Sequence, residues 1–225
     1  MVAASLNVDA RKTLGHVNLH YRNPEEGPLA ARFMELLGFT KVLDMEIPGG
    51  GRFYQFYVDG NASNNGDGIL YLSPLPASQR ELIAVIQQKL QVGTADEHPA
   101  VGKIRAAHAK DPEADFHVGL LLDSLEALEA TMLRLKDLAD NDPQLKGRLK
   151  VLVNRARPGT PEVDARMDAS PLYRDVTRYT YGRNGVQAFV ETDILASGPL
   201  ADGVVIELDY VFPGYAENLF TVVEM

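Results

Sequence analysis

Two histidines occupy equivalent places in two similar stretches of this chain. His16 lies in the run LGHVNLHYRN and His117 in the run DFHVGLLLDS, and an amphipathic stretch follows each. Glu207 lies in the middle of a third strand-like run, GVVIELDYVF. Two imidazoles and a carboxylate on separate strands are typical of a metal site with open coordination positions. The repeated strand and helix predict a duplicated fold.

The first copy is predicted to run β-α-β-β-β. Residues 13–21 alternate around His16 as in a strand, and the apolar residues after Pro28 recur at helical spacing up to Gly38, a plausible C-cap. Residues 40–47, 51–58 and 69–73 are predicted to be three further strands, the first two joined by a glycine-rich hairpin turn.

The second copy begins at Phe116, and its helix is predicted from the apolar face of Leu125, Leu128, Met132 and Leu135. The Ser78–Glu81 and Asp123–Glu126 pairs are expected to cap helices. The division of the chain is expected to be a first module at 13–75, a helical connector at 76–114, a second module at 115–212 with a long loop at 158–175, and a tail at 213–225.

Composition limits the classes of function. The chain has 225 residues with ordinary hydrophobic content, a net charge of −9, and no cysteine. The acidic balance argues against nucleic acid or an anionic membrane as partner. Any metal must be held by nitrogen and oxygen ligands. No signal-like or membrane-spanning apolar segment is recognised, so we expect a cytoplasmic protein.

The order of these segments resembles the vicinal oxygen chelate superfamily, which includes glyoxalase I, the bleomycin- and fosfomycin-resistance proteins and the extradiol dioxygenases. The pieces that carry the resemblance are GHVNL with FMELLGF, FHVGLLLDSLEAL, QAFVE and GVVIEL. The fold it implies is α+β, with two βαβββ modules forming a cupped, barrel-like mixed sheet with flanking helices. The metal ligands it implies are His16, His117 and Glu207.

The fourth ligand position of the family falls on Tyr71, where glyoxalase-type members usually have Glu or His. The remaining His-His-Glu set resembles the facial triad of Fe(II) extradiol dioxygenases, so the expected cofactor is a divalent metal, first of all Fe(II), with Zn, Ni or Mn as alternatives. Tyr71 would donate a hydrogen bond to a metal-bound oxygen or line the cavity. His20 would act as an acid/base beside the metal or serve as a hydrogen-bonded structural residue.

Three functions are compatible with these residues. The first is an extradiol-type dioxygenase acting on a catechol-like aromatic. The second is a glyoxalase-like isomerase or lyase using Zn, Ni or Co. The third is a non-enzymatic, resistance-type protein that binds a planar or hydrophobic ligand without metal, for which the aromatic side chains of Phe53, Tyr54, Phe56 and Tyr57 would supply contacts. All three imply a small-molecule partner, and both a monomer and a homodimer are compatible with two modules in one chain.

Overall fold

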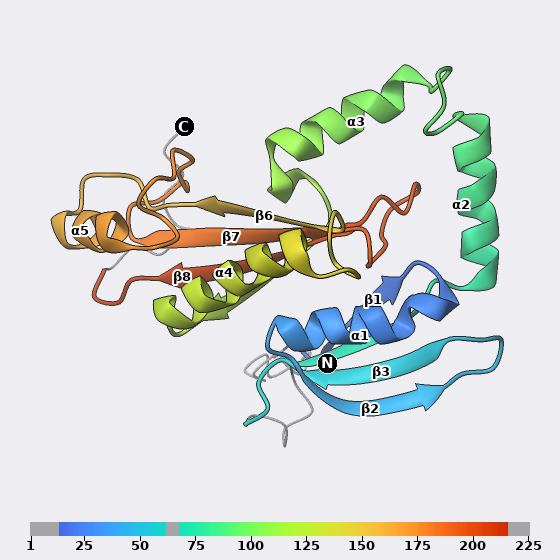
Figure 1. Ribbon diagram of the computed structural model, residues 1–225, viewed down its shortest axis with the longest axis horizontal. Helices are drawn as coiled ribbons and strands as arrows, with labels where there is room; N and C mark the ends of the chain where they lie inside the picture. The colour runs from blue at the N-terminus through green and yellow to red at the C-terminus, as the bar shows by residue number, and fades with distance from the viewer. Residues whose placement is uncertain (1–13, 62–67, 216–225) are drawn as a thin grey trace, which may run out of the picture.

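The first module is an open four-stranded sheet with one helix. The computed structural model describes residues 14–61 and 68–215 (Figure 1). The strand order is β1-β4-β3-β2, with β1 parallel to β4 and the other neighbours antiparallel. The elements are β1 (His16–Tyr21), α1 (Gly27–Leu36), β2 (Thr40–Glu46), β3 (Arg52–Tyr57) and β4 (Ile69–Pro74).

The second module repeats this topology. Its order is β5-β8-β7-β6, again with one parallel pair, β5 and β8. The elements are β5 (His117–Leu122), α4 (Leu125–Asn141), β6 (Leu149–Asn154), β7 (Gly185–Thr192) and β8 (Val204–Val211). The predicted α+β class with two βαβββ modules is therefore confirmed. Neither sheet closes on itself, because each strand order is linear with two edge strands.

Two helices form the connector, α2 (Ala77–Lys89) and α3 (Pro99–Lys110). In Figure 1 they arch along one side of the molecule, from the end of β4 toward the start of β5. The predicted Ser78–Glu81 capping box is wrong, since α2 begins after Pro76 without a side-chain cap. The cap of α4 is Ser124 rather than Asp123, and its hydroxyl accepts the Ala127 N–H at 3.1 Å.

The segment predicted as a long loop at 158–175 contains a helix, α5 (Pro161–Ala169), so that prediction is wrong. Pro161 occupies the first turn, where its missing N–H costs nothing. Val163 and Met167, four residues apart, share one face and are both buried. This short helix lies at the end of the second module away from the connector (Figure 1).

Both modules share one hydrophobic core. A single cluster of buried side chains includes Phe33 and Met34 of α1 and Leu128 and Met132 of α4. A β-bridge between Tyr21 and Leu195 also crosses from the first module to the second. The two sheets are therefore parts of one packed body. No helix of the described ranges is long and apolar enough to span a membrane.

Strand alternation decides which residues of the second sheet can form a site. Helix α4 packs against β6 and β8, so the apolar side chains of Ile206 and Leu208 face it. Glu207 and Asp209 alternate with them and point to the opposite face. Cross-strand register places Gln187 of β7 opposite Asp209 on that same face. The second module thus has one apolar and one polar sheet face.

Candidate metal centre

His117 and Glu207 meet on the polar face of the second sheet. The His117 Nε2 atom is 3.5 Å from Glu207 Oε2. Gly119 is the register partner of Glu207. A Cβ at this position would lie in van der Waals contact with Glu207 Oε2, at 3.7 Å, so the glycine leaves that space beside the carboxylate open. The Glu207 side chain is only 5% exposed, whereas His117 is 33% exposed and open to a ligand.

The hydrogen bonds of His117 leave its Nε2 free to bind a cation. Its Nδ1 lies 3.0 Å from the Asp115 carbonyl oxygen, which can only accept. In the neutral imidazole Nδ1 therefore carries the proton, and the lone pair of Nε2 faces Glu207. Two acceptors that face each other need a proton or a cation between them. Two ligands about 2.1 Å from a tetrahedral ion are about 3.4 Å apart, close to the observed separation.

Gln187 sets the orientation of Glu207. Its Nε2 donates to Glu207 Oε1 at 2.7 Å and to Glu113 Oε1 at 2.5 Å. Its own carbonyl oxygen accepts from Asn154 Nδ2 at 3.2 Å, and Asn154 in turn accepts from Arg178 Nε at 3.0 Å. This chain fixes which end of the Gln187 amide points at the carboxylates. Because Oε1 of Glu207 is engaged, Oε2 is the atom left to His117.

A second buried carboxyl stands beside this pair. Burial raises the pKa of Glu207, and the nearby Glu113 raises it further, whereas Gln187 and His117 act in the opposite direction. Burial also raises the pKa of Asp209, with Glu207 as the next cause. Within the described ranges, Asp209 Oδ1 is buried without a hydrogen-bond partner. The Asp209 carboxyl is also hydrogen-bonded to that of Glu207. The imidazole nitrogen of His117 and the carboxylate oxygen of Glu207 are ligand types that suit a divalent cation.

The first module holds the other predicted residues in a separate group. The ring of His16 lies 5.1 Å from that of Tyr71, and Tyr71 lies 5.4 Å from Phe53. His20 Nδ1 is 3.2 Å from Ser73 Oγ, and its Nε2 is 3.4 Å from Asn18 Nδ2. Both nitrogens of His20 thus have side-chain partners, which is compatible with either of its two predicted roles.

The structure brings together two of the three predicted ligands. Within residues 14–61 and 68–215, no three His, Asp or Glu side chains are arranged to hold a metal ion. His16 belongs to the other sheet and does not join His117 and Glu207 in one such group. Sequence reasoning also missed Gln187 and Glu113. Gln187 could have been found as a polar residue in the otherwise apolar run GVQAFV, but nothing in the polar connector singles out Glu113.

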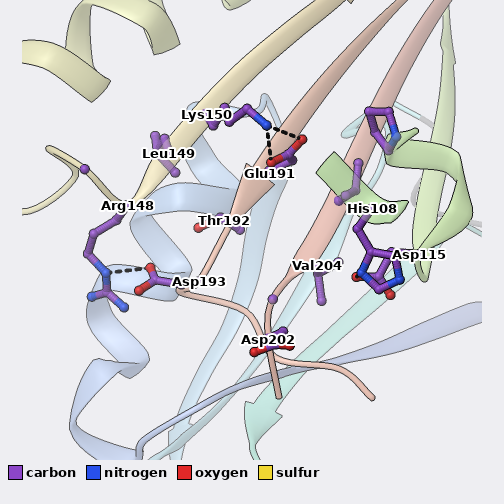
Figure 2. A pocket seen from close by; sticks show the side chains of 14 residues that line it. His108, Asp115, Arg148, Leu149, Lys150, Glu191, Thr192, Asp193, Asp202 and Val204 are labelled. Carbon is purple, nitrogen blue, oxygen red and sulfur yellow. Dashed lines mark hydrogen bonds and ion pairs between the residues drawn. The ribbon is translucent and has the colours of Figure 1, made fainter. Parts of the chain in front are cut away.

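A cavity of about 300 Å³ opens at the ends of β6, β7 and β8, and neither His117 nor Glu207 lines it. Figure 2 shows the Lys150–Glu191 ion pair on one side and His108 with Asp115 on the other. Val205 also lines the cavity and is the register partner of His117. The cavity therefore borders the same strands as the candidate metal centre, with a lining of paired charges and apolar side chains.

Comparisons with known proteins give only distant matches. No family model matches the sequence, and no curated protein matches it. Among solved structures, the chain is similar to a glyoxalase/bleomycin resistance protein/dioxygenase family enzyme from Burkholderia phytofirmans PsJN. That match has 11% identity and a TM-score of 0.34, and covers 89% of this chain and 100% of that chain.

A second match is a xylose isomerase-like TIM barrel/4-hydroxyphenylpyruvate dioxygenase fusion protein, with 14% identity and a TM-score of 0.19. It covers 91% of this chain and 27% of that chain. Because both TM-scores are low, neither match supports a conclusion about function. A function can be inferred only from the strand order and from the residues themselves.

Proposed function

We propose that this chain is a divalent metal-dependent enzyme of the glyoxalase/dioxygenase type, with extradiol cleavage of a catechol-like aromatic as its first candidate reaction. The observation that supports the proposal is the His117–Glu207 pair, in which an imidazole lone pair and a carboxylate oxygen face each other at 3.5 Å. One imidazole and one carboxylate are two of the three ligands of a non-haem Fe(II) facial triad. The roles expected for His16, His20 and Tyr71 remain predictions.

The residues of the chain have distinct tasks in this proposal. Fe(II), when bound, would supply Lewis acidity and a place for O2 beside a catecholate. His117 and Glu207 would hold the ion, and Gln187 would keep Glu207 turned toward it. Asp209, whose pKa is raised by burial, would retain a proton close to the substrate. The cavity lined by Val205 would admit the small-molecule substrate.

Metal content and oxygen uptake test this function together. Protein purified anaerobically and loaded with Fe(II) is expected to bind one equivalent of iron and to consume O2 with at least one member of a catechol panel. His117→Ala and Glu207→Gln should abolish both. Wild-type protein that binds no metal after reconstitution would contradict the proposal and leave the non-enzymatic binding protein as the remaining hypothesis.

A glyoxalase-like isomerase or lyase is the second candidate, and one observation favours it. Glu207 and Asp209 are neighbouring buried carboxyls with raised pKa values, which suits transfer of a proton to and from a carbon next to a carbonyl. Zinc- or nickel-loaded protein would then convert a hemithioacetal or a 2-oxo ester under strictly anaerobic conditions. Turnover without O2 would select this reaction over the dioxygenase.

A further inference from the structure

A small cavity lies where the first module, the connector and the second module meet. Its volume is about 160 Å³, and it is lined by Arg22, which follows β1, and by Arg80 of α2. The loop before β8 contributes Ala201. Among the described residues that line this cavity, none carries a carboxylate. Two positive charges therefore border it, in a chain whose net charge is −9.

The backbone around Arg22 fixes its place. Tyr21, directly before it, forms a β-bridge to Leu195, and its carbonyl oxygen accepts from the Leu75 N–H at 2.9 Å. Arg22 donates from Nη2 to the carbonyl oxygen of Ala201, which is buried. The Arg22 guanidinium is thus tethered through one nitrogen to the second module.

Arg80 is tethered from the connector side. Residues 80, 83, 84 and 87 share one face of α2, and this face lines the cavity. Arg80 Nη1 donates to the Leu75 carbonyl oxygen at 2.7 Å. One helical turn further than Ile83, Gln87 Nε2 donates to the Leu200 carbonyl oxygen at 2.8 Å, which holds α2 against the second module.

The two guanidiniums lack negative partners. In residues 14–61 and 68–215, each bonds to a carbonyl oxygen and neither pairs with an Asp or Glu side chain. Arg22 Nε is buried and has no hydrogen-bond acceptor in the same ranges. A buried N–H without an acceptor is unfavourable, and an oxyanion would supply both the acceptor and the missing negative charge.

We propose that this cavity binds a compact oxyanion, either a phosphate group or a small carboxylate, between Arg22 and Arg80. The guanidinium fork matches the oxygen geometry of both groups. Pockets for drug-sized ligands begin at roughly 300 Å³, so a cavity of about 160 Å³ fits a small anion rather than a nucleotide. Asn23 also lines the cavity, but its amide donates to Glu26 and is not assigned to the anion.

This site is separate from the candidate metal centre and does not depend on the proposed function. A bound anion would join Arg22 of the first module to Arg80 of the connector, beside the Ala201 loop of the second module. Because it would bind the folded chain and not the unfolded one, it should stabilise the packing of the three parts.

Inorganic phosphate is the first probe. Thermal unfolding and titration calorimetry of the full chain are measured at constant ionic strength, with chloride as the replaced anion. We expect phosphate to raise the melting temperature and to bind at one site per chain. Acetate, titrated in the same way, distinguishes the two ligand classes: tighter binding of phosphate assigns a phosphorylated ligand, and tighter binding of acetate assigns a carboxylate.

Arg22→Gln and Arg80→Gln should each weaken binding of the preferred anion at least about tenfold, because a hydrogen bond to a charged group contributes about that factor. Arg134→Gln, at an exposed position on α4, is the matched control and should bind like the wild type. His117→Ala should also bind the anion like the wild type, which separates this site from the metal centre.

Ala84→Glu tests the cavity without removing an arginine. Ala84 lies at the cavity on α2 and is exposed, so the new carboxylate can pair with the guanidiniums without disturbing buried side chains. This variant should unfold at a temperature no lower than the anion-free wild type and should lose anion binding.

Two results would overturn the proposal. One is a wild type that neither binds nor is stabilised by phosphate or acetate beyond the effect of chloride. The other is wild-type anion binding in Arg22→Gln, Arg80→Gln and Ala84→Glu, because the anion would then bind elsewhere. The melting temperature of each variant without added anion shows whether it folds, so loss of binding is attributed to the cavity only in folded protein.

Discussion

At the scale of single residues, the candidate centre depends on one amide. Gln187 is 3% exposed and uses both N–H groups on carboxylates and its oxygen on Asn154. Because each polar atom of the Gln187 side chain makes a hydrogen bond, its amide is held in one orientation, and its bond to Glu207 fixes the position of that carboxylate. We therefore regard Gln187 as a positioning residue of the centre rather than a ligand.

Gln187→Leu is expected to lower the free energy of unfolding by about 2 kcal/mol, because it removes the N–H donor shared by Glu207 and Glu113 and the oxygen that accepts from the buried Asn154 amide. It should also weaken metal binding. Denaturant unfolding and calorimetry measure the two effects. Gln88→Leu, at an exposed position, is the control, and a Gln187→Leu protein with wild-type stability would contradict the network.

Asp209 makes the stability of the metal-free protein depend on pH. Burial, with Glu207 close by, raises its pKa from the ordinary 3.8 to about 8. The folded state therefore holds a proton that the unfolded chain has already lost, and stability falls as pH rises through that interval. We expect the denaturant midpoint of chelator-treated protein to drop between about pH 5 and about pH 8. Asp209→Asn should flatten this dependence, and an equally steep fall in the variant would speak against it.

At the scale of elements, α5 is anchored to α4 by a buried ion pair. Arg166 donates to both carboxylate oxygens of Glu129, at 3.1 and 2.8 Å, and Ser170 also donates to Glu129. Glu129 is 6% exposed. The pair joins the helix that sequence reasoning missed to the helix that covers the second sheet.

Arg166→Leu is expected to destabilise the fold by about 2–3 kcal/mol, because it leaves the buried Glu129 without its cation. The double variant with Glu129→Leu should recover much of that loss, as measured by denaturant unfolding. Arg174→Leu removes an exposed arginine paired with exposed Asp175 and should change little. A loss in the double variant as large as in the single one would rule out this explanation.

Elements with strong periodicity could be predicted from the sequence. The strands around His16 and His117 and the apolar face of α4 follow from alternation and helical spacing. Helix α5 could not be predicted, because a segment of nine residues with prolines and charges nearby shows too little helical periodicity. Its stability comes from the ion pair of Arg166 and from two buried side chains. The pairing of His117 with Glu207 was predicted. The hydrogen bond between Gln187 and Glu113 was not predicted, because it joins residues that are far apart in the sequence.

At the scale of the whole molecule, ion pairs tie the two modules together. Arg32 of α1 binds Asp142, at the end of α4, through two hydrogen bonds of 3.2 and 2.5 Å. Arg148 binds Glu26 of the first module at 2.8 Å. The packing of the two modules against each other cannot be predicted from hydrophobic periodicity, because it depends on such long-range contacts. The resemblance to a known family implied that His16 and His117 converge, and the structure keeps them in separate groups.

The Arg32–Asp142 pair predicts how module docking responds to acid. The hydrogen bond from Arg32 is the first cause that lowers the pKa of Asp142 to about 2. The pairing therefore stabilises the fold above the ordinary carboxyl pKa and is lost as pH falls toward 2. The difference in denaturant midpoint between the wild type and Arg32→Gln should shrink from about pH 6 to about pH 3. Lys41→Gln, which breaks an exposed pair with Glu35, serves as control, and a constant difference would argue against the assignment.

Locating one bound ion tests the central claim most directly. Crystals of the full chain grown with Mn(II) should show a single anomalous peak between His117 and Glu207. A peak at His16, or none on the polar face of the second sheet, would contradict the proposed metal centre.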